Sequence, residues 1–173
     1  MSAGTVRAAI AAFMTNPLIS GLGGFYQAEP FGAPGSTREP LTGGTPGAGA
    51  LGFVWISEEN EERQTLPVLY GNKSVEYKVT IALLYRYARA TNTGSDTFDA
   101  WIHPLDDLVD AVKARIRSDP TFGQPSVIFQ AGQGPVGSNS VDLKTSWLKP
   151  VLVGQQIEAW VAIDLDVIEI ITG

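Results

Sequence analysis

The chain has 173 residues, a formal net charge of −6 at pH 7, no cysteine and a single histidine, His103. The length fits one domain, and the missing cysteines exclude a disulfide scaffold, a thiolate zinc site and a cysteine nucleophile. The acidic balance argues against a general binder of nucleic acid or acidic membranes, and 17% charged beside 44% hydrophobic residues is typical of a protein that hides surface in an assembly.

An amphipathic helix is predicted over residues 5–15. Its apolar residues recur at helical spacing, and Asn16-Pro17 ends the pattern because the residue before a proline is disfavoured in the α conformation. Arg7 interrupts the apolar residues, so no signal peptide is expected. No stretch of 18 apolar residues occurs either, so we expect no transmembrane helix and a product assembled in the cytoplasm.

Residues 21–52 are rich in glycine and proline, with ten of the 19 glycines and four of the 11 prolines. This composition predicts a long extended loop inserted after the helix, and a loop of such length is normally functional or disordered. Its candidate anchors on a neighbouring subunit are Phe25, Tyr26, Phe31 and Leu41. The alternative is a passive surface insertion.

Two short strands around an acidic segment are predicted next. Residues 51–57 are apolar and aromatic, and residues 66–70 are the candidate return strand. The segment between them predicts a solvated hairpin tip, because close like charges repel one another. Its carboxylates are Glu58, Glu59, Glu61 and Glu62.

The clearest strand covers residues 74–89, where apolar or aromatic residues occupy every odd position from 75 to 87. Alternation of this length indicates a long antiparallel strand with one buried face. A helix is predicted over residues 98–118 from an apolar stripe at helical spacing. Pro104 lies early in this helix, and Asp119-Pro120 ends it.

The last part of the chain is predicted to form strands. Residues 126–130 and 141–149 flank a Gly-rich turn at 131–140, and residues 155–171 alternate with an apolar odd face. Antiparallel strands with few helices give an α+β fold, in which a mainly antiparallel sheet carries helices on one face. We expect a single such domain over residues 1–173.

Few residues fit a catalytic or metal site. Asp164 and Asp166 share a face of the last strand, about 7 Å apart, with Glu158 further along, so a divalent-metal site is one alternative. Acids on a strand or a helix more often mark the solvent side, and the same holds for Asp106 and Asp110. His103, at a helix start, is expected to have a surface role. No catalytic residue and no cofactor is assigned.

Two further motifs are weak. Residues 132–137 fit Gly-x-Gly-x-x-Gly, but a strand follows them, so no helix N-terminus is available for a phosphate and a hairpin turn is expected. The one basic-aromatic patch is weak evidence for nucleic-acid binding in a chain with a net charge of −6. Its residues are Tyr85, Arg86, Tyr87 and Arg89.

The order of the elements carries a resemblance. An N-terminal amphipathic helix and a Gly/Pro-rich excursion precede a Tyr-x-Val-x-Ile-x-Leu strand from Tyr77 to Leu83, a central helix and C-terminal strands. In pattern and layout, most closely over residues 74–171, this resembles the tail terminator proteins of long-tailed bacteriophages.

The resemblance implies a structural virion protein rather than an enzyme. Tail terminators form a ring, usually of six subunits, on the head-proximal end of the tail tube, which stops tube polymerisation and joins the tail to the neck. The implied partners are further copies of the chain, the tail tube protein and a neck or head-completion protein. Genomic DNA passes through without specific binding, and no membrane is involved. We expect the acidic residues 58–62 to face this channel, where carboxylates repel phosphate.

A closed ring needs two different patches on each subunit. The long strands 74–89 and 155–171 and the Gly-rich loop are the candidates for them. Three alternatives stay open: another neck ring protein, a small metal-dependent enzyme using Asp164 and Asp166, and a monomeric ligand- or peptide-binding module with an apolar pocket.

Overall fold

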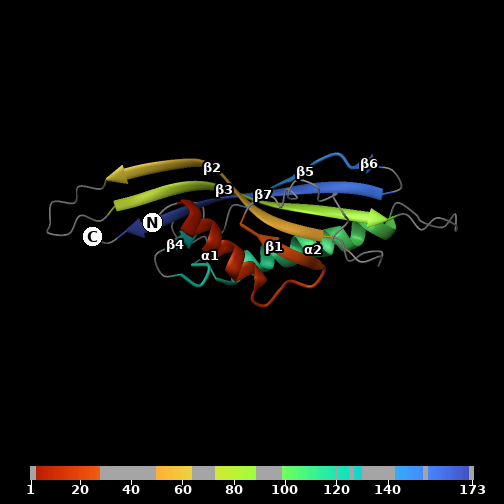
Figure 1. The fold of residues 1–173 in the computed structure, drawn as a ribbon, viewed down its shortest axis with the longest axis horizontal. Helices are drawn as coiled ribbons and strands as arrows, with labels where there is room; N and C mark the ends of the chain where they lie inside the picture. The colour runs from red at the N-terminus through yellow and green to blue at the C-terminus, as the bar shows by residue number, and fades with distance from the viewer. Residues whose placement is uncertain are drawn as a thin grey trace, which may run out of the picture.

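The computed structural model of the protein describes residues 3–27, 50–63, 73–88, 99–119, 121–124, 127–129, 143–153 and 156–171. Two helices and seven strands follow one another in this part of the chain (Figure 1). They are α1 (Ala3–Thr15), β1 (Leu22–Tyr26), β2 (Ala50–Arg63), β3 (Lys73–Ala88), α2 (Asp99–Ser118), β4 (Val127–Phe129), β5 (Lys144–Trp147), β6 (Val151–Val153) and β7 (Gln156–Ile171). The predicted α+β class is confirmed.

The strands form one sheet in the order β1-β2-β3-β7-β4, with β5 and β6 also paired to β7. Strand β7 is paired along its whole length with β3 and, on its other side, with β6, β5 and β4 in turn. Every pairing is antiparallel except that of β1 with β2. The long alternating segments are antiparallel strands, as their sequence predicts, and the pairings place them at the centre of the sheet.

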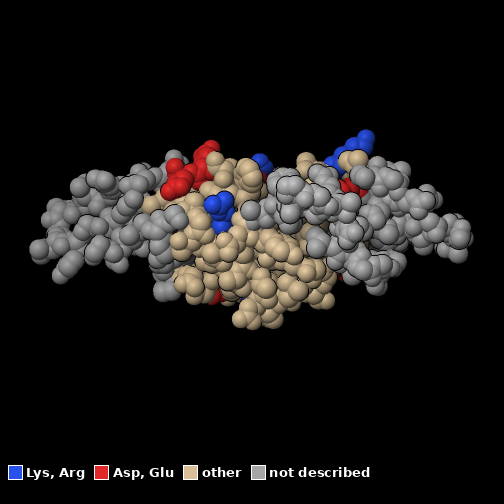
Figure 2. All heavy atoms as spheres, viewed as in Figure 1, with Lys and Arg blue, Asp and Glu red and all other residues tan. Residues whose placement is uncertain are grey.

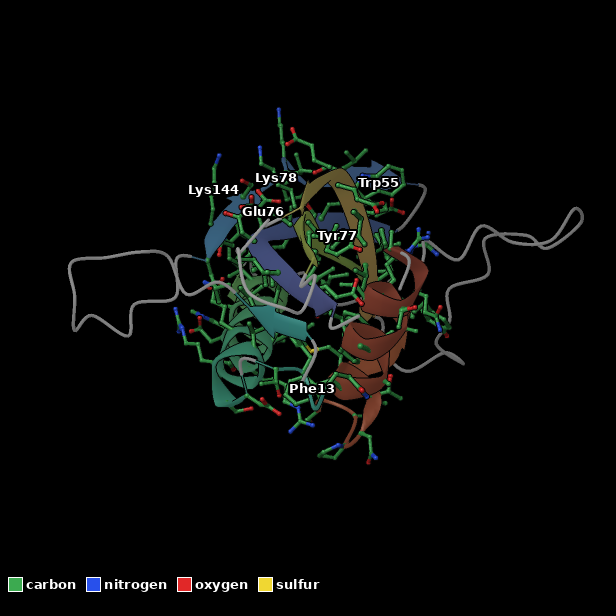
Figure 3. The ribbon with its side chains drawn as sticks, turned by 90° about the vertical axis from the view of Figure 1, so that its left-hand side faces the viewer. Phe13, Trp55, Glu76, Tyr77, Lys78 and Lys144 are labelled. Carbon is green, nitrogen blue, oxygen red and sulfur yellow. The ribbon has the colours of Figure 1, made fainter. Side chains whose placement is uncertain are left out.

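Both helices lie on one face of the sheet (Figures 1 and 3). α1 contacts β1 and β2, and the apolar stripes of both helices pack on the odd-numbered residues of β3 and β7. The core includes Val6, Ile10, Met14, Leu105, Val109, Val112, Ile116, Val79, Ile81, Leu83, Val161, Ile163 and Leu165. No helix among the described residues has the length and apolarity needed to cross a lipid bilayer.

Strand β2 is much longer than predicted. The acidic residues expected at a hairpin tip instead continue the strand to Arg63 and pair with Lys73–Lys78 of β3. The hairpin-tip prediction is thus wrong, because cross-strand pairing holds these residues extended despite their like charges. The predicted return strand at 66–70 lies outside the described residues, and the strand that pairs with β2 is β3.

A β-bulge between Ile56 and Glu58 changes which β2 residues face the helices. Before the bulge, the buried Val54 lies opposite Ile81 on the helix side. After it, Glu59 lies opposite the buried Tyr77. Glu58 lies opposite Lys78 on the sheet face that carries no helix, which we call the uncovered face. The side-chain alternation therefore reverses at the extra residue, Ser57.

The Gly/Pro-rich segment does not begin as a loop. Residues 22–26 form β1, which lies at the edge of the sheet, where the loss of packing and pairing at glycines costs least. At the other end of the segment, Ala50–Gly52 belong to β2. Of the predicted strand at 141–149, the structure describes residues 143–149, and β5 covers Lys144–Trp147 of these; β6 follows after Pro150.

Candidate interaction surface

The sheet face opposite the helices carries rows of polar side chains from neighbouring strands. In one row Glu58 of β2, Lys78 of β3 and Asp166 of β7 lie side by side in register, and all three are exposed. The Lys78 ammonium lies 2.7 Å from a Glu58 carboxylate oxygen. This hydrogen bond, followed by the charges of Glu58, Asp166 and Glu76, raises the pKa of Lys78 above its ordinary value.

The next row is built around an exposed tryptophan. Trp55 lies opposite Thr80, which lies opposite Asp164, which in turn lies opposite Lys144 of β5. The Thr80 hydroxyl donates to Asp164 Oδ1 at 2.6 Å. Trp55 is 56% exposed, so a large apolar side chain stands among charges on the uncovered face (Figure 3).

The other end of this face carries an aromatic contact, with an ion pair next to it. Phe53 and Trp160 pack edge to face with ring centroids 6.0 Å apart. Beyond them Arg86 Nε donates to Glu158 Oε2 at 3.2 Å, and Trp160 Nε1 donates to Glu158 Oε1 at 3.0 Å. Glu158 is therefore fully engaged in packing this end of the sheet.

These contacts weigh against the metal-site alternative. Asp164 and Glu158 are six residues apart on β7, about 20 Å along the strand. Each carboxylate already has a hydroxyl, an indole or a cation beside it. Among the described residues, no group of three or more His, Asp or Glu side chains is placed to hold a metal ion.

The edge formed by β5 and β6 exposes a second apolar group, which the sequence pattern did not single out. Trp147 is 46% exposed, and Leu148 and Val151 are each 57% exposed. Lys144 and Lys149 flank them and are exposed as well. We call these five residues the basic edge. Large apolar side chains exposed close together along the chain mark interaction sites more often than isolated ones do.

The predicted aromatic anchors have different positions. Phe25 is buried in the core of its own chain, so the prediction that it docks on a neighbour is wrong. Its ring lies over Gly52, where an added Cβ would fall 2.2 Å from Phe25 Cδ2. Tyr26, the next residue on β1, is exposed. Phe31 and Leu41 lie outside the described residues.

The predicted channel-facing carboxylates divide between two faces of β2. Glu58 is on the uncovered face and Glu59 is on the helix side, and both side chains are exposed. Glu61 and Glu62 continue the strand, in register with Val75 and Ser74. With Trp55, the exposed pair Glu58 and Glu59 forms what we call the acidic edge.

The sequence analysis did not single out one carboxylate that the structure shows to be buried. Glu169 has no exposed surface, although it lies on the core face of β7, opposite Val75 and Val127. Its Oε2 accepts a hydrogen bond of 3.0 Å from the Tyr77 hydroxyl. Its Oε1 has no hydrogen-bond partner in the described structure. The signal was a single Glu at an odd, core-facing position of an otherwise apolar alternation.

The remaining candidate residues are not brought together. His103, Asp106 and Asp110 are exposed on α2, as their surface role predicts. In the basic-aromatic patch, Tyr85 is buried and Arg86 is paired with Glu158. The side chain of Tyr87, all of Arg89 and the Gly-rich turn at 132–137 lie outside what the structure describes.

Comparison with known proteins adds no family to this picture. No protein-family model matches the chain, and no curated protein matches it either.

Proposed function

We propose that this chain is a structural virion protein that forms a ring on the head-proximal end of a phage tail tube. In this role it stops tube polymerisation and joins the tail to the neck. It belongs in the virion, at the tail–neck junction, and catalyses no reaction. The proposal starts from the pattern of elements from α1 to β7 that resembles the tail terminators.

The observation that carries the proposal is the exposure of large apolar side chains on well-formed strands. Trp55 on β2 and Trp147 on β5 are half exposed, and both lie on strands that pair with a neighbour rather than in loops. Tryptophan is enriched in protein–protein interfaces and is expensive to leave in water. A chain with so few charges and such side chains on its sheet is suited to an assembly in which they are covered.

The polar residues of the sheet support an assembly role over catalysis. Glu58 and Lys78 pair with each other, Thr80 donates to Asp164, and Arg86 pairs with Glu158. Groups that satisfy one another in this way orient a surface, whereas a catalytic site needs a nucleophile or base left available to a substrate.

The last residues of β2 fit the inner side of such a ring. Of the four carboxylates expected at the channel, Glu61 and Glu62 continue β2 beyond the acidic edge, in register with Val75 and Ser74. Carboxylates along a conduit repel phosphate, so a genome passes without adhering to the wall.

A measurement of mass and of tube length tests the proposal. The purified protein is sized by light scattering, alone and with tail-tube protein from the same virion, and tube lengths are measured by electron microscopy as tubes polymerise. We expect a ring of about six subunits, in solution or on tube ends, and a halt in tube growth. A monomer that leaves tube growth unchanged contradicts the proposal. A ring that ignores tubes but binds the head portal indicates the alternative neck position.

A further inference from the structure

Two edges of the sheet are free on the described chain. β1 pairs with β2 only as far as Tyr26 opposite Phe53, so β2 from Val54 to Arg63 has β3 as its one described partner strand. On the far side of the sheet, β5 and β6 pair with β7 and with no other described strand. Unpaired strand edges are ready to associate with another chain, and proteins usually protect them.

The two edges carry opposite charges. The acidic edge offers Glu58 and Glu59 beside Trp55, while the basic edge offers two lysines around Trp147. Figure 2 shows Asp and Glu gathered over β2 at one end of the upper border of the molecule and Lys and Arg at the other end, where Asp or Glu atoms lie beside them. Each edge therefore combines exposed apolar surface with charges that complement those of the other.

The charges of the two edges remain largely available. Glu58 is paired with Lys78, but within the described residues Glu59, Lys144 and Lys149 take part in no ion pair. Figure 3 shows Trp55 and Lys144 at opposite sides of the sheet, so the edges of one chain are separated by the width of β2, β3, β7 and β5. Each edge needs a second molecule to meet its complement.

The two edges are also of equal length. The free part of β2, residues 54–63, and the β5–β6 edge, residues 144–153, each span ten residues. Each edge runs along eight steps of its neighbouring strand, from Ile81 to Lys73 of β3 and from Asp164 to Gln156 of β7, which is about 26 Å. One edge can therefore lie along the whole of the other.

We infer that the basic edge of one copy docks against the acidic edge of the next copy. Because the two patches differ and lie on opposite borders of the sheet, the contact is head-to-tail, and repetition around a rotation axis closes a ring. This inference rests on the proposed ring function and specifies its subunit contact. Trp55, on the face opposite the helices, and Trp147, which lies opposite the core residue Val161 on the helix side, then flank the contact from the two faces of the joined sheet.

Charge reversal at each edge tests the contact. One variant carries Lys144→Glu and Lys149→Glu, the other carries Glu58→Lys and Glu59→Lys, and each is sized by light scattering after its folding is checked by circular dichroism. We expect each variant alone to lose the ring, because like charges then face each other. An equimolar mixture should recover it, since each interface in an alternating ring again pairs opposite charges.

Matched controls separate this contact from a general charge effect. Asp106→Lys with Asp107→Lys reverses two carboxylates that are exposed on α2, away from both edges, and should leave the ring intact. Rings from either edge variant alone, or a mixture that stays monomeric while both variants are folded, would overturn the docking inference and leave the proposed function standing. If mixing the two variants restores rings, but wild-type rings do not halt tube growth, the proposed function is overturned and the docking contact is kept.

Discussion

At the scale of single residues, the most informative position is Glu169. A carboxylate in an apolar core is costly unless it is hydrogen-bonded, and here only one of its two oxygens has a described donor, the Tyr77 hydroxyl. In coiled coils a single buried polar residue fixes the register of the packed elements at some expense of stability. In this sheet the pair ties β3 to β7 close to the three-residue strand β4.

The coupling of Tyr77 and Glu169 is measurable by a double-mutant cycle. Tyr77→Phe should lower the free energy of unfolding by about 1–3 kcal/mol, because it leaves the buried carboxylate without its donor. In a Glu169→Leu background the same change should cost clearly less, since no carboxylate remains to be satisfied. Urea unfolding of the four proteins gives both values, and equal costs in the two backgrounds would contradict the coupling.

At the scale of elements, Arg115 joins the two helices. From α2 its guanidinium donates to the main-chain oxygens of Phe13, at 3.1 Å, and Asn16. The guanidinium carbon also lies 4.3 Å from the centre of the Phe13 ring. Carbonyls at the end of α1, which have no partner within the helix, are thereby satisfied by the neighbouring helix.

Removal of this side chain should separate the helices. Arg115→Ala is expected to destabilise the protein by about 1–3 kcal/mol through lost hydrogen bonds and the lost cation–π contact. The free energy of unfolding of Arg115→Lys should lie between those of wild type and Arg115→Ala, because an ammonium cannot reproduce the planar, forked donors of a guanidinium. Arg117→Ala, at an exposed position on the same helix, is the control, and chemical denaturation that shows equal effects at both positions would refute the joining role.

The turn after α2 depends on Asp119. One carboxylate oxygen accepts from the Thr121 hydroxyl at 2.6 Å and amide at 2.8 Å, and the other accepts from the Gly123 amide at 3.0 Å. This turn holds Phe122 at a φ of 50°, with its ring edge-on to Phe13. The Thr121 hydroxyl, then the two amides, hold the pKa of Asp119 below its ordinary 3.8.

The lowered pKa of Asp119 predicts a pH dependence of stability. A carboxyl group whose pKa is lower in the folded than in the unfolded chain stabilises the fold above the unfolded value, and that contribution disappears as the pH falls through the folded value. The difference in free energy of unfolding between wild type and Asp119→Asn should therefore be constant around neutral pH and shrink below about pH 3.8. Thermal unfolding at several pH values measures it, and a difference that does not change on acidification would rule the mechanism out.

At the scale of the whole molecule, docking between charged edges predicts sensitivity to salt. The Debye length shortens from about 10 Å at 0.1 M to about 3 Å at 1 M ionic strength. Ring mass measured by light scattering should fall toward that of the monomer as sodium chloride is raised. An assembly whose mass is the same at both concentrations would be held by apolar contacts without the charges.

Long patterns were readable in the sequence, and short or composite ones were not. β3 and β7 were predictable because alternation extends over their whole length, and α2 because its apolar stripe continues past Pro104. β1 was hidden in a glycine-rich context because its stability comes from pairing with β2, which lies far away in the sequence. The acidic half of β2 was mistaken for a turn because local repulsion suggested one, whereas β3 supplies the pairing.

The candidate surface was even less accessible to sequence reasoning. Glu58 was a candidate, but the bulge that places it on the face opposite the helices is a property of the pairing with β3. Trp147 and Leu148 appear as an ordinary strand end in the sequence, and their exposure follows from the position of β5 at the border of the sheet.

The central position of β7 also sets the order of events during synthesis. The ribosome makes β7 after β3, β4, β5 and β6, yet all four pair with it. Until Gln156–Ile171 has left the exit tunnel, β3 has β2 as its one described neighbour, and β4, β5 and β6 have no described strand partner at all. The sheet is therefore completed in a late, concerted step built on contacts between distant parts of the chain, which is the slow class of folding reaction. Nascent chains halted before residue 156 should be open to protease along β4, β5 and β6, and the same segments should become protected once β7 emerges.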